Sequence, residues 1–492
     1  MSAFVQHEVL GALLISVLVI SVLGSAELLK RLTALPREMT RKFAHVGSGM
    51  ALLSIPLLIH SHWTVLALAV SFIVLMYGTS ALGVLGSVHG VGRGVGGVLW
   101  YPFTGWLVYF VVFELLERPF VFYAIPVAVL ASADAFGAIV GTTYGKHRYE
   151  VFEGHQRSLE GSGAFFIVAF FCVHVPLLLA GTTGRAETLL ISLVIALLAA
   201  MLETVSMYGL DNLLVPFGVL FMLERFSDLG VSSLLLRLGI LALCAGIGLV
   251  MAWRKPNTMG AAVALVLSAY TIWALGGSAW IGPMAGLLVA FVLYERLSPV
   301  QETHSRSRYD MGTVVTGVTV PLALVLLHEF APSAEARQAL YIAFLAALAC
   351  QASVLFYMMP QNRTFRFKGV RRRVSSPDAW QYRVTPGKLL FALVGSSIPV
   401  SLQAGGPPPI TAAVLGMLWG IGGLTIFILL ASTPRSLMTC PRCGMLTMRG
   451  MYCCTDTRLG DGEKLWALNF RKTYLLSNTI AAVAATGLLW TH

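Results

Sequence analysis

Three clusters of ionisable residues interrupt long apolar stretches in the first half of the chain, and the first contains Arg41, Lys42 and His45. His45 lies about one helical turn inside apolar sequence, where an ionisable group is costly and usually faces a protein interior or a water-filled cavity. Arg41 and His45 are spaced to share one face of a helix. We therefore expect a polar site at the start of this helix. The simpler alternative is a set of cations that marks the membrane boundary.

The second cluster starts with Asp134, at the end of an apolar run, and continues to Lys146 and Arg157. Glycines at four-residue intervals follow Asp134 and leave one helix face without side chains. One interpretation is close packing of two helices. The other is close approach of the backbone to a nucleotide, with Asp134 on Mg²⁺ and the cations neutralising phosphates. The glycines are Gly137, Gly141 and Gly145.

The third cluster is formed by Glu203, Asp211 and Asn212. Glu203 lies inside an apolar sequence, where a carboxylate needs a cation or a metal ion as its partner. If the helix continues, Glu203 and Asp211 lie about two turns apart on similar faces. Asn212 would add a neutral oxygen ligand. The alternative is a pair of charges at a helix break near Gly209.

The composition indicates what kind of protein must position these side chains. Of the 492 residues, 57% are hydrophobic and only 12% are charged, about half the roughly 25% expected of a soluble domain. This excludes a soluble enzyme, a secreted disulfide scaffold and a disordered chain. The apolar runs are long and continuous, which excludes a β-barrel. We expect an all-α, polytopic bundle of transmembrane helices.

Apolar runs predict about 14–16 membrane spans, arranged in two halves. The chain carries 34 Lys and Arg against 23 Asp and Glu, a net charge of +11, and the excess lies in short loops. The positive-inside rule explains these loops without a nucleic-acid partner and places them in the cytoplasm. The first run, Val9 to Leu29, reads as a retained helix with its N-terminus outside. All three ionisable clusters then face the cytoplasm, an arrangement suited to a polyanionic substrate with a divalent metal.

The chain divides near residue 255, into segments 1–254 and 255–492. The second segment contains a cysteine-rich loop, 432–473, that we expect in the cytoplasm, where a disulfide is disfavoured. Its four thiols could bind a structural Zn²⁺, and free thiols are the alternative. These residues are Cys440, Cys443, Cys453 and Cys454.

The three clusters together resemble the CTP-dependent polyprenol kinase family, which includes phytol kinases, dolichol kinases and CTP-dependent diacylglycerol kinases. The resemblance covers residues 30–225, and four motifs carry it in the same order and at similar spacing. They are Arg41-Lys42-Phe-Ala-His45; Asp134 through Gly137 and Gly141 to Gly145-Lys146; Arg157-Ser158-Leu-Glu160-Gly161-Ser162; and Glu203 followed by Asp211-Asn212 and Pro216.

The resemblance implies transfer of the γ-phosphoryl group of CTP to an isoprenoid alcohol dissolved in the bilayer. It implies Mg²⁺ on Asp134 and Asp211. The residues expected to contact nucleotide or phosphate are Arg41, Lys42, Gly141, Gly145, Lys146 and Arg157, and the expected catalytic residues are His45, Glu160 and Glu203.

Two other functions remain open at this point. A phosphatidate cytidylyltransferase would transfer CMP and release pyrophosphate, and a lipid transporter or flippase would turn over no nucleotide on a lipid. The second half weakly resembles the phytyl-phosphate-kinase-like membrane family around Gly260 to Gly282 and at its cysteines. Its stretch from Leu348 to Leu355 has no carboxylate where that family carries one. We therefore expect this half to be a degenerate partner that handles lipid.

Overall fold

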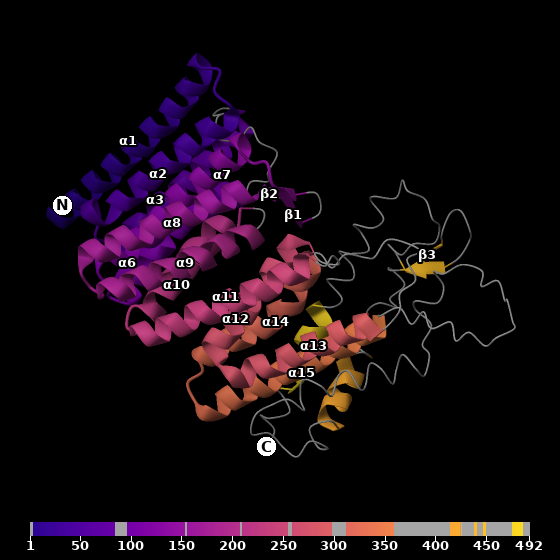
Figure 1. Ribbon diagram of the computed structural model, residues 1–492. Helices are drawn as coiled ribbons and strands as arrows, with labels where there is room; N and C mark the ends of the chain where they lie inside the picture. The colour runs from indigo at the N-terminus through magenta and orange to yellow at the C-terminus, as the bar shows by residue number, and fades with distance from the viewer. Residues whose placement is uncertain are drawn as a thin grey trace, which may run out of the picture. The chain divides into compact units, whose positions relative to one another are not determined.

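The computed structural model describes most of the chain, and Figure 1 shows its course. The described residues are almost entirely helical, which confirms the all-α class. Two short antiparallel hairpins are the strands among them. The described residues are 3–83, 96–152, 155–206, 209–253, 258–297, 311–358, 414–423, 425, 437–439, 446–448 and 475–485.

The chain separates into two compact units. Unit 1 comprises Met1–Trp253 and Thr258–Leu267, and unit 2 comprises Arg254–Asn257 and Ser268–His492. The elements up to residue 253 are α1 (Ala3–Leu32), α2 (Arg37–Leu58), α3 (His62–Ala81), α5 (Gly96–Tyr109), the π-helix η1 (Phe110–Leu115), α6 (Phe120–Ala128), the π-helix η2 (Val129–Ala133), α7 (Asp134–Thr143), β1 (Arg148–Phe152), β2 (His155–Ser158), α8 (Leu159–Ala180), α9 (Arg185–Val205), α10 (Asp211–Phe226) and α11 (Val231–Trp253).

Beyond residue 258 the described elements are again mainly helices. In unit 2, Trp280 packs against Phe344 in an apolar core, and the buried Gln351 amide donates to the Gly317 carbonyl oxygen. The four thiols expected to bind zinc lie outside the described residues. The elements are α12 (Met259–Gly276), α13 (Ser278–Leu297), α14 (Met311–Glu329), α15 (Ala334–Met358), β3 (Leu437–Thr439), β4 (Leu446–Met448) and helices at Val414–Gly423 and Leu475–Ala485.

Seven of the described helices are long and apolar enough to cross a membrane, and shorter apolar helices accompany them. This confirms an integral membrane protein. The expected total of 14–16 spans stays a prediction, because segment 388–404 lies outside the described residues. The seven are Phe4–Leu32, His62–Ala81, Phe120–Thr143, Leu159–Ala180, Arg185–Val205, Val231–Ala252 and Met259–Gly276.

Helix α2 lies at the centre of the contacts that matter for the ionisable clusters. It packs against α1 on one side and against α6, η2 and α7 on the other, and α10 packs against η2 as well. In Figure 1 these helices form the indigo-to-magenta bundle. The elements that carry the first, second and third clusters are therefore neighbours within unit 1.

The sequence places Asp134 at the end of a span over 119–133, and the structure differs. Helices α6, η2 and α7 form one continuous apolar segment, Phe120–Thr143, so Asp134 lies inside it. Ion pairing explains the difference, because Lys42 of α2 supplies a counter-charge to Asp134 within the bundle. A buried carboxylate with a paired cation does not have to end a membrane helix.

Helix α2 approaches η2 closely at Gly49. A Cβ atom on Gly49 would lie 2.2 Å from the Cβ of Ala131 and 2.9 Å from the Tyr101 hydroxyl oxygen. Neither neighbour is the end of a flexible chain that can move aside. Glycine at this position therefore lets the backbone of the first cluster reach the backbone that precedes Asp134.

We expect Gly49→Ala to destabilise the protein by about 1–3 kcal/mol, the usual cost of overpacking a filled core. Gly78→Ala on α3 is the matched control, because a Cβ there meets nothing within 4 Å. Alanine favours a helix over glycine by about 0.5–1 kcal/mol, so Gly78→Ala should be neutral or slightly stabilising. Thermal unfolding in detergent measures both, and equal midpoints would contradict the close crossing at Gly49.

Candidate active site

The π-helix η2 prepares the position of Asp134. Its five residues immediately precede Asp134, and a π-helix interrupts the regular pairing of backbone carbonyls and amides. The Leu130 carbonyl oxygen accepts a hydrogen bond from the His45 imidazole of α2, with His45 Nε2 at 3.0 Å. Segments of π-helix are frequent at functional sites. Here the segment ties the helix that carries Asp134 to the helix that carries His45.

Lys42 and Asp134 form a nearly buried ion pair between α2 and α7. The Lys42 Nζ lies 2.5 Å from Asp134 Oδ2, and the two side chains are 2% and 18% exposed. A pair this poorly solvated is held by direct charge and hydrogen bonding. The structure thus brings together the proposed phosphate contact of the first cluster and the proposed metal ligand of the second, which are 92 residues apart in the chain.

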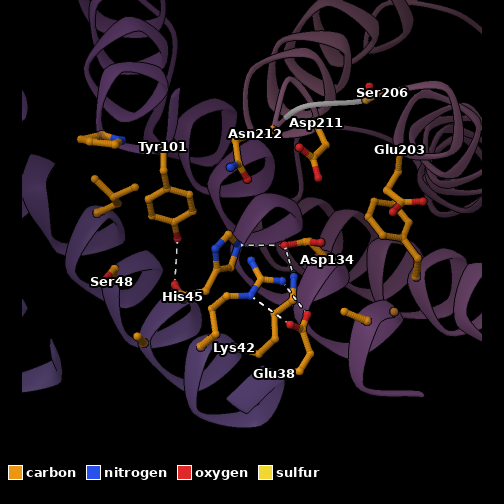
Figure 2. Close-up of a pocket in the computed structure, with 18 of the residues that line it drawn as sticks. Glu38, Lys42, His45, Ser48, Tyr101, Asp134, Glu203, Ser206, Asp211 and Asn212 are labelled. Atoms are coloured by element: carbon orange, nitrogen blue, oxygen red, sulfur yellow. Dashed lines mark hydrogen bonds and ion pairs between the residues drawn. The ribbon is translucent and has the colours of Figure 1, made fainter. Parts of the chain in front are cut away.

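His45 lies against the same carboxylate, and its ring geometry indicates its protonation pattern. Nε2 is 3.0 Å from the Leu130 carbonyl oxygen and 3.3 Å from Asp134 Oδ2. Both neighbours are acceptors, so Nε2 carries the proton and, in the neutral imidazole, Nδ1 carries the lone pair. The Tyr101 hydroxyl donates to the His45 carbonyl oxygen at 2.9 Å, and the two rings pack together. Figure 2 shows Tyr101, His45, Lys42 and Asp134 in one group.

Arg157 and Glu203 form an ion pair with each other. The Arg157 guanidinium also donates to the backbone carbonyls of Glu203, at 2.7 Å, and of Ser206, at 3.4 Å. These carbonyls belong to the end of α9, where a positive charge and extra donors are favourable. Arg157 thereby anchors the hairpin β1–β2 to α9. The buried carboxylate of Glu203 has the cationic partner that the sequence requires.

Asp211 and Asn212 begin α10 and face Asp134 across the site (Figure 2). Burial, together with the negative charge of Asp134, raises the pKa of the Asp211 carboxyl. A second, very small hollow is lined by Asp134, Glu203, Asp211 and Asn212 together. The third cluster therefore meets the second, and its carboxylate is placed where an added cation would stabilise the charged form.

The donors present fit Mg²⁺. Among the described residues, no three side chains of the types His, Cys, Asp and Glu converge on one metal position. Mg²⁺ requires less, because it is usually held by one or two carboxylates together with substrate phosphates and water. Asp134 and Asp211 supply two carboxylates, and Asn212 supplies an amide oxygen. All three are hard oxygen donors of the kind that Mg²⁺ prefers.

The glycine face of α7 packs against the start of α8. A Cβ on Gly141 would lie 3.1 Å from Ser158 Oγ, and one on Gly161 would lie 2.9 Å from the Gly141 Cα. Ser158 caps α8 by accepting from the Gly161 amide at 3.1 Å. Close helix packing is thus present at these glycines. Gly137 and Gly141 also line a cavity of about 910 Å³ that joins the three clusters. A contact of Gly141 with nucleotide stays a prediction.

Three expected site residues do not line that cavity. Glu160 accepts from the His147 amide at 3.1 Å and from its ring Nδ1 at 2.7 Å, and so holds the turn before β1. Lys146 is exposed beside it, and a Cβ on Gly145 would lie 2.7 Å from Ser158 Oγ. A catalytic role of Glu160 and phosphate contacts of Lys146 and Gly145 stay predictions.

A cavity of about 910 Å³ joins the clusters. It is polar at one end and apolar along α1, α2 and α3. Figure 2 shows the polar end, with Asp211 and Glu203 extending into the same space as Asp134. The expected site residues that line it are Arg41, Lys42, His45, Asp134, Gly141, Arg157, Glu203 and Asp211.

Two further side chains, to which no site role was assigned from the sequence, shape this cavity. Tyr101 supports the backbone of His45 from α5, and Glu38 holds Arg41 through an ion pair of 2.5 Å. Glu38 is readable as an i,i+3 partner of Arg41 on a helix. The Tyr101-Pro102 dipeptide after Gly96-Gly97 resembles an element of the same kinase family, but it does not indicate which residue Tyr101 contacts.

Comparison with known proteins agrees with these observations. No family model matches the chain, and no solved structure matches it. A curated protein, the phytol kinase of Synechocystis sp., is 36% identical over 203 residues, which make up 40% of this chain and 83% of that protein. The similarity thus covers most of the length of an independent relative, and the chain belongs to the phytol kinase family.

Proposed function

We propose that this protein is a membrane kinase that transfers the γ-phosphoryl group of a nucleoside triphosphate to an isoprenoid alcohol, with CTP as the favoured donor. The observation that carries the proposal is the cluster of Lys42, Asp134 and His45 at the polar end of a cavity that continues between apolar helices. Membership of the phytol kinase family supports both the reaction and the class of alcohol. Phytol itself is the first alcohol to test.

The cations of the polar end suit a triphosphate. Arg41, Lys42, Arg148 and Arg157 all line the cavity. Phosphoryl transfer depends mainly on positioning and on stabilising negative charge on the transferred group. Glu38, Asp134 and Glu203 form ion pairs with three of these cations. An incoming triphosphate would take over part of that role.

The reaction forms one bond and breaks one. The hydroxyl oxygen of the alcohol attacks the γ-phosphorus, and the bond from that phosphorus to the bridging oxygen breaks, so that the nucleoside diphosphate leaves with the electron pair. The hydroxyl proton needs an acceptor. His45 is better suited than Glu203, because its Nδ1 carries a lone pair while the Glu203 carboxylate is paired with Arg157. Asp134 orients His45 through Nε2.

Asp134 and Asp211 would hold Mg²⁺, with Asn212 as a further oxygen donor. Bound Mg²⁺ would neutralise charge on the phosphate oxygens as the phosphoryl group moves. The preference for CTP rests on the four motifs shared with the CTP-dependent polyprenol kinases. A cytoplasmic nucleotide site rests on the basic loops and the positive-inside rule.

The position of the label decides between the candidate reactions. The purified full-length chain in vesicles is given CTP labelled on the α- or the γ-phosphate, together with phytol or phosphatidate and Mg²⁺. We expect γ-label, and no α-label, in a phytyl phosphate product, with ATP, GTP and UTP giving slower transfer. Transfer of α-label to phosphatidate with release of pyrophosphate would instead identify a cytidylyltransferase. An absence of label in every lipid would contradict the kinase and favour a transporter.

For unit 2 we propose a lipid-handling role without phosphoryl transfer of its own. The stretch from Leu348 to Leu355 carries no carboxylate, and its described part packs into an apolar core through Leu348, Ala349 and Ala352. Deleting 268–492 would test this proposal. Retained γ-transfer by the remaining chain with weaker use of vesicle-bound phytol would support it.

A further inference from the structure

The site cavity has a second, apolar arm that the phosphoryl-transfer chemistry does not use. Past His45 the cavity continues along α2, with α1 and α3 forming its other walls and Trp106 of α5 beside it. The arm is lined by residues of α1 and α3 and by the residues of α2 from Ser48 to Ile55. This lining contains two serines, Ser48 and Ser80, and no charged side chain. An arm of this composition cannot take a nucleotide or a lipid headgroup, but it suits a hydrocarbon chain.

The arm has a defined length. It accompanies α2 from His45 to Ile55, which corresponds to about 15 Å at a rise of 1.5 Å per residue. Ile55 and Val65 are 3% and 2% exposed and form its innermost lining. The arm therefore extends over roughly half of a hydrocarbon core of about 30 Å.

Beyond Ile55 the helices close on each other. A Cβ on Gly11 of α1 would lie 2.2 Å from the Leu58 carbonyl oxygen of α2, so the two backbones touch. The buried Glu8 carboxylate accepts from the His60 amide at 2.8 Å, and the Tyr109 hydroxyl donates to the Ile59 carbonyl oxygen at 3.1 Å. This hydrogen-bonded turn between α2 and α3 is a fixed floor for the arm.

We propose that the arm between α1, α2 and α3 binds the isoprenoid chain of the alcohol and measures its length against the floor at Ile55 and Val65. The inference rests on the proposed kinase function and names the part of the same cavity that selects the substrate. With the hydroxyl oxygen beside His45 and Asp134, a chain directed along α2 lies in the arm. Chains longer than the arm must leave it sideways and lose apolar contact.

Ala69 of α3 is the position from which to block the arm, since it lines the cavity and is 5% exposed. Ala69→Phe should lower turnover of twenty-carbon geranylgeraniol and phytol relative to ten-carbon geraniol by at least about tenfold, given the sensitivity of apolar pockets to single methylenes. Turnover of geraniol should persist, which shows that the variant is folded. Ala67→Phe, on the exposed face of the same helix, is the matched control and should leave the ratio unchanged.

Ile55→Ala tests the floor from the other side. Shortening this side chain should raise the turnover of twenty-five-carbon geranylfarnesol relative to geranylgeraniol. This variant also keeps the proposal testable if Ala69→Phe does not fold. Wild-type ratios in Ile55→Ala and in a folded Ala69→Phe would overturn the proposed arm.

A photoreactive phytol separates failure of the arm from failure of the kinase. The probe carries a diazirine at the end of its chain, and the adducts on the full-length protein are mapped by mass spectrometry. We expect adducts on the stretch 65–72 of α3 and around Ile55, reduced by excess geranylgeraniol and unaffected by excess diacylglycerol. Such adducts without any γ-transfer would contradict the kinase alone. Transfer to phytol with adducts only on outward-facing residues, or adducts displaced by diacylglycerol, would contradict the arm alone.

Discussion

Asp134→Asn should abolish γ-transfer, lowering kcat by at least roughly 10²–10³-fold, the range found when one preorganised electrostatic contact is removed. Asparagine keeps the size of the side chain and one oxygen acceptor for Lys42, whose Nζ lies 2.5 Å from the carboxylate. It removes the charge that a metal ion and His45 require. Initial rates of label transfer from γ-labelled CTP to phytol in vesicles measure the effect.

Asp228→Asn is the control for this substitution, because Asp228 is an exposed acidic residue outside the cavity. We expect it to retain the activity of the unchanged protein. Both variants should insert into membranes and elute as the wild type does in detergent. An Asp134→Asn variant that keeps wild-type kcat would remove Asp134 from the catalytic site.

Lys42→Met should both inactivate and destabilise the protein. Removing one partner of a buried ion pair typically costs about 3–5 kcal/mol, because the other charge is left without compensation. Replacing both partners by uncharged side chains is often nearly neutral. The double variant Lys42→Met/Asp134→Asn should therefore have a higher thermal midpoint than Lys42→Met alone, while both stay inactive.

Thermal unfolding in detergent measures this recovery, and Lys30→Met is the control at a half-buried basic position outside the cavity. We expect a coupling energy of about 0.5–3 kcal/mol between the two positions, as found for side chains in direct contact. Strictly additive effects would show that the pair does not exist in the folded protein. Activity in the double variant would contradict the proposed roles of both residues.

Much of the polar site could be predicted because charge is rare in this chain. Lys42, Asp134 and Glu203 each stand out against apolar sequence, and each must find a partner inside the bundle. The sequence predicted that these charged residues would meet in one site, but not which residue pairs with which. That Lys42 pairs with Asp134 and Arg157 with Glu203 depends on which helices are neighbours, and no local pattern specifies this.

The position of Asp134 shows why the end of its membrane span was wrongly predicted from the sequence. A charge at the end of an apolar run normally marks the membrane surface, yet the helix continues to Thr143 because α2 supplies the counter-charge. The π-helix before Asp134 has no readable sequence signal, since Val129–Ala133 is ordinary apolar sequence. Long-range packing decides both features.

The apolar arm was beyond sequence reasoning for a related reason. Val19 and Phe72 lie in spans that are apolar on nearly every face, so hydropathy cannot distinguish lipid-facing side chains from cavity-facing ones there. Gly11 gives a partial signal, because a small residue in a span suggests a close crossing. The crossing partner, Leu58, is visible only in the fold.

The binding of Mn²⁺ with CTP, measured by electron paramagnetic resonance, tests most directly whether this cavity holds a metal and a nucleotide together. Mn²⁺ replaces Mg²⁺ at oxygen sites and reports binding without turnover. The account predicts that Mn²⁺ and CTP bind together to the unchanged protein and to Asp228→Asn, and that Asp134→Asn and Asp211→Asn each weaken this binding at least about tenfold. Equal binding of Mn²⁺ and CTP by all four proteins would contradict it.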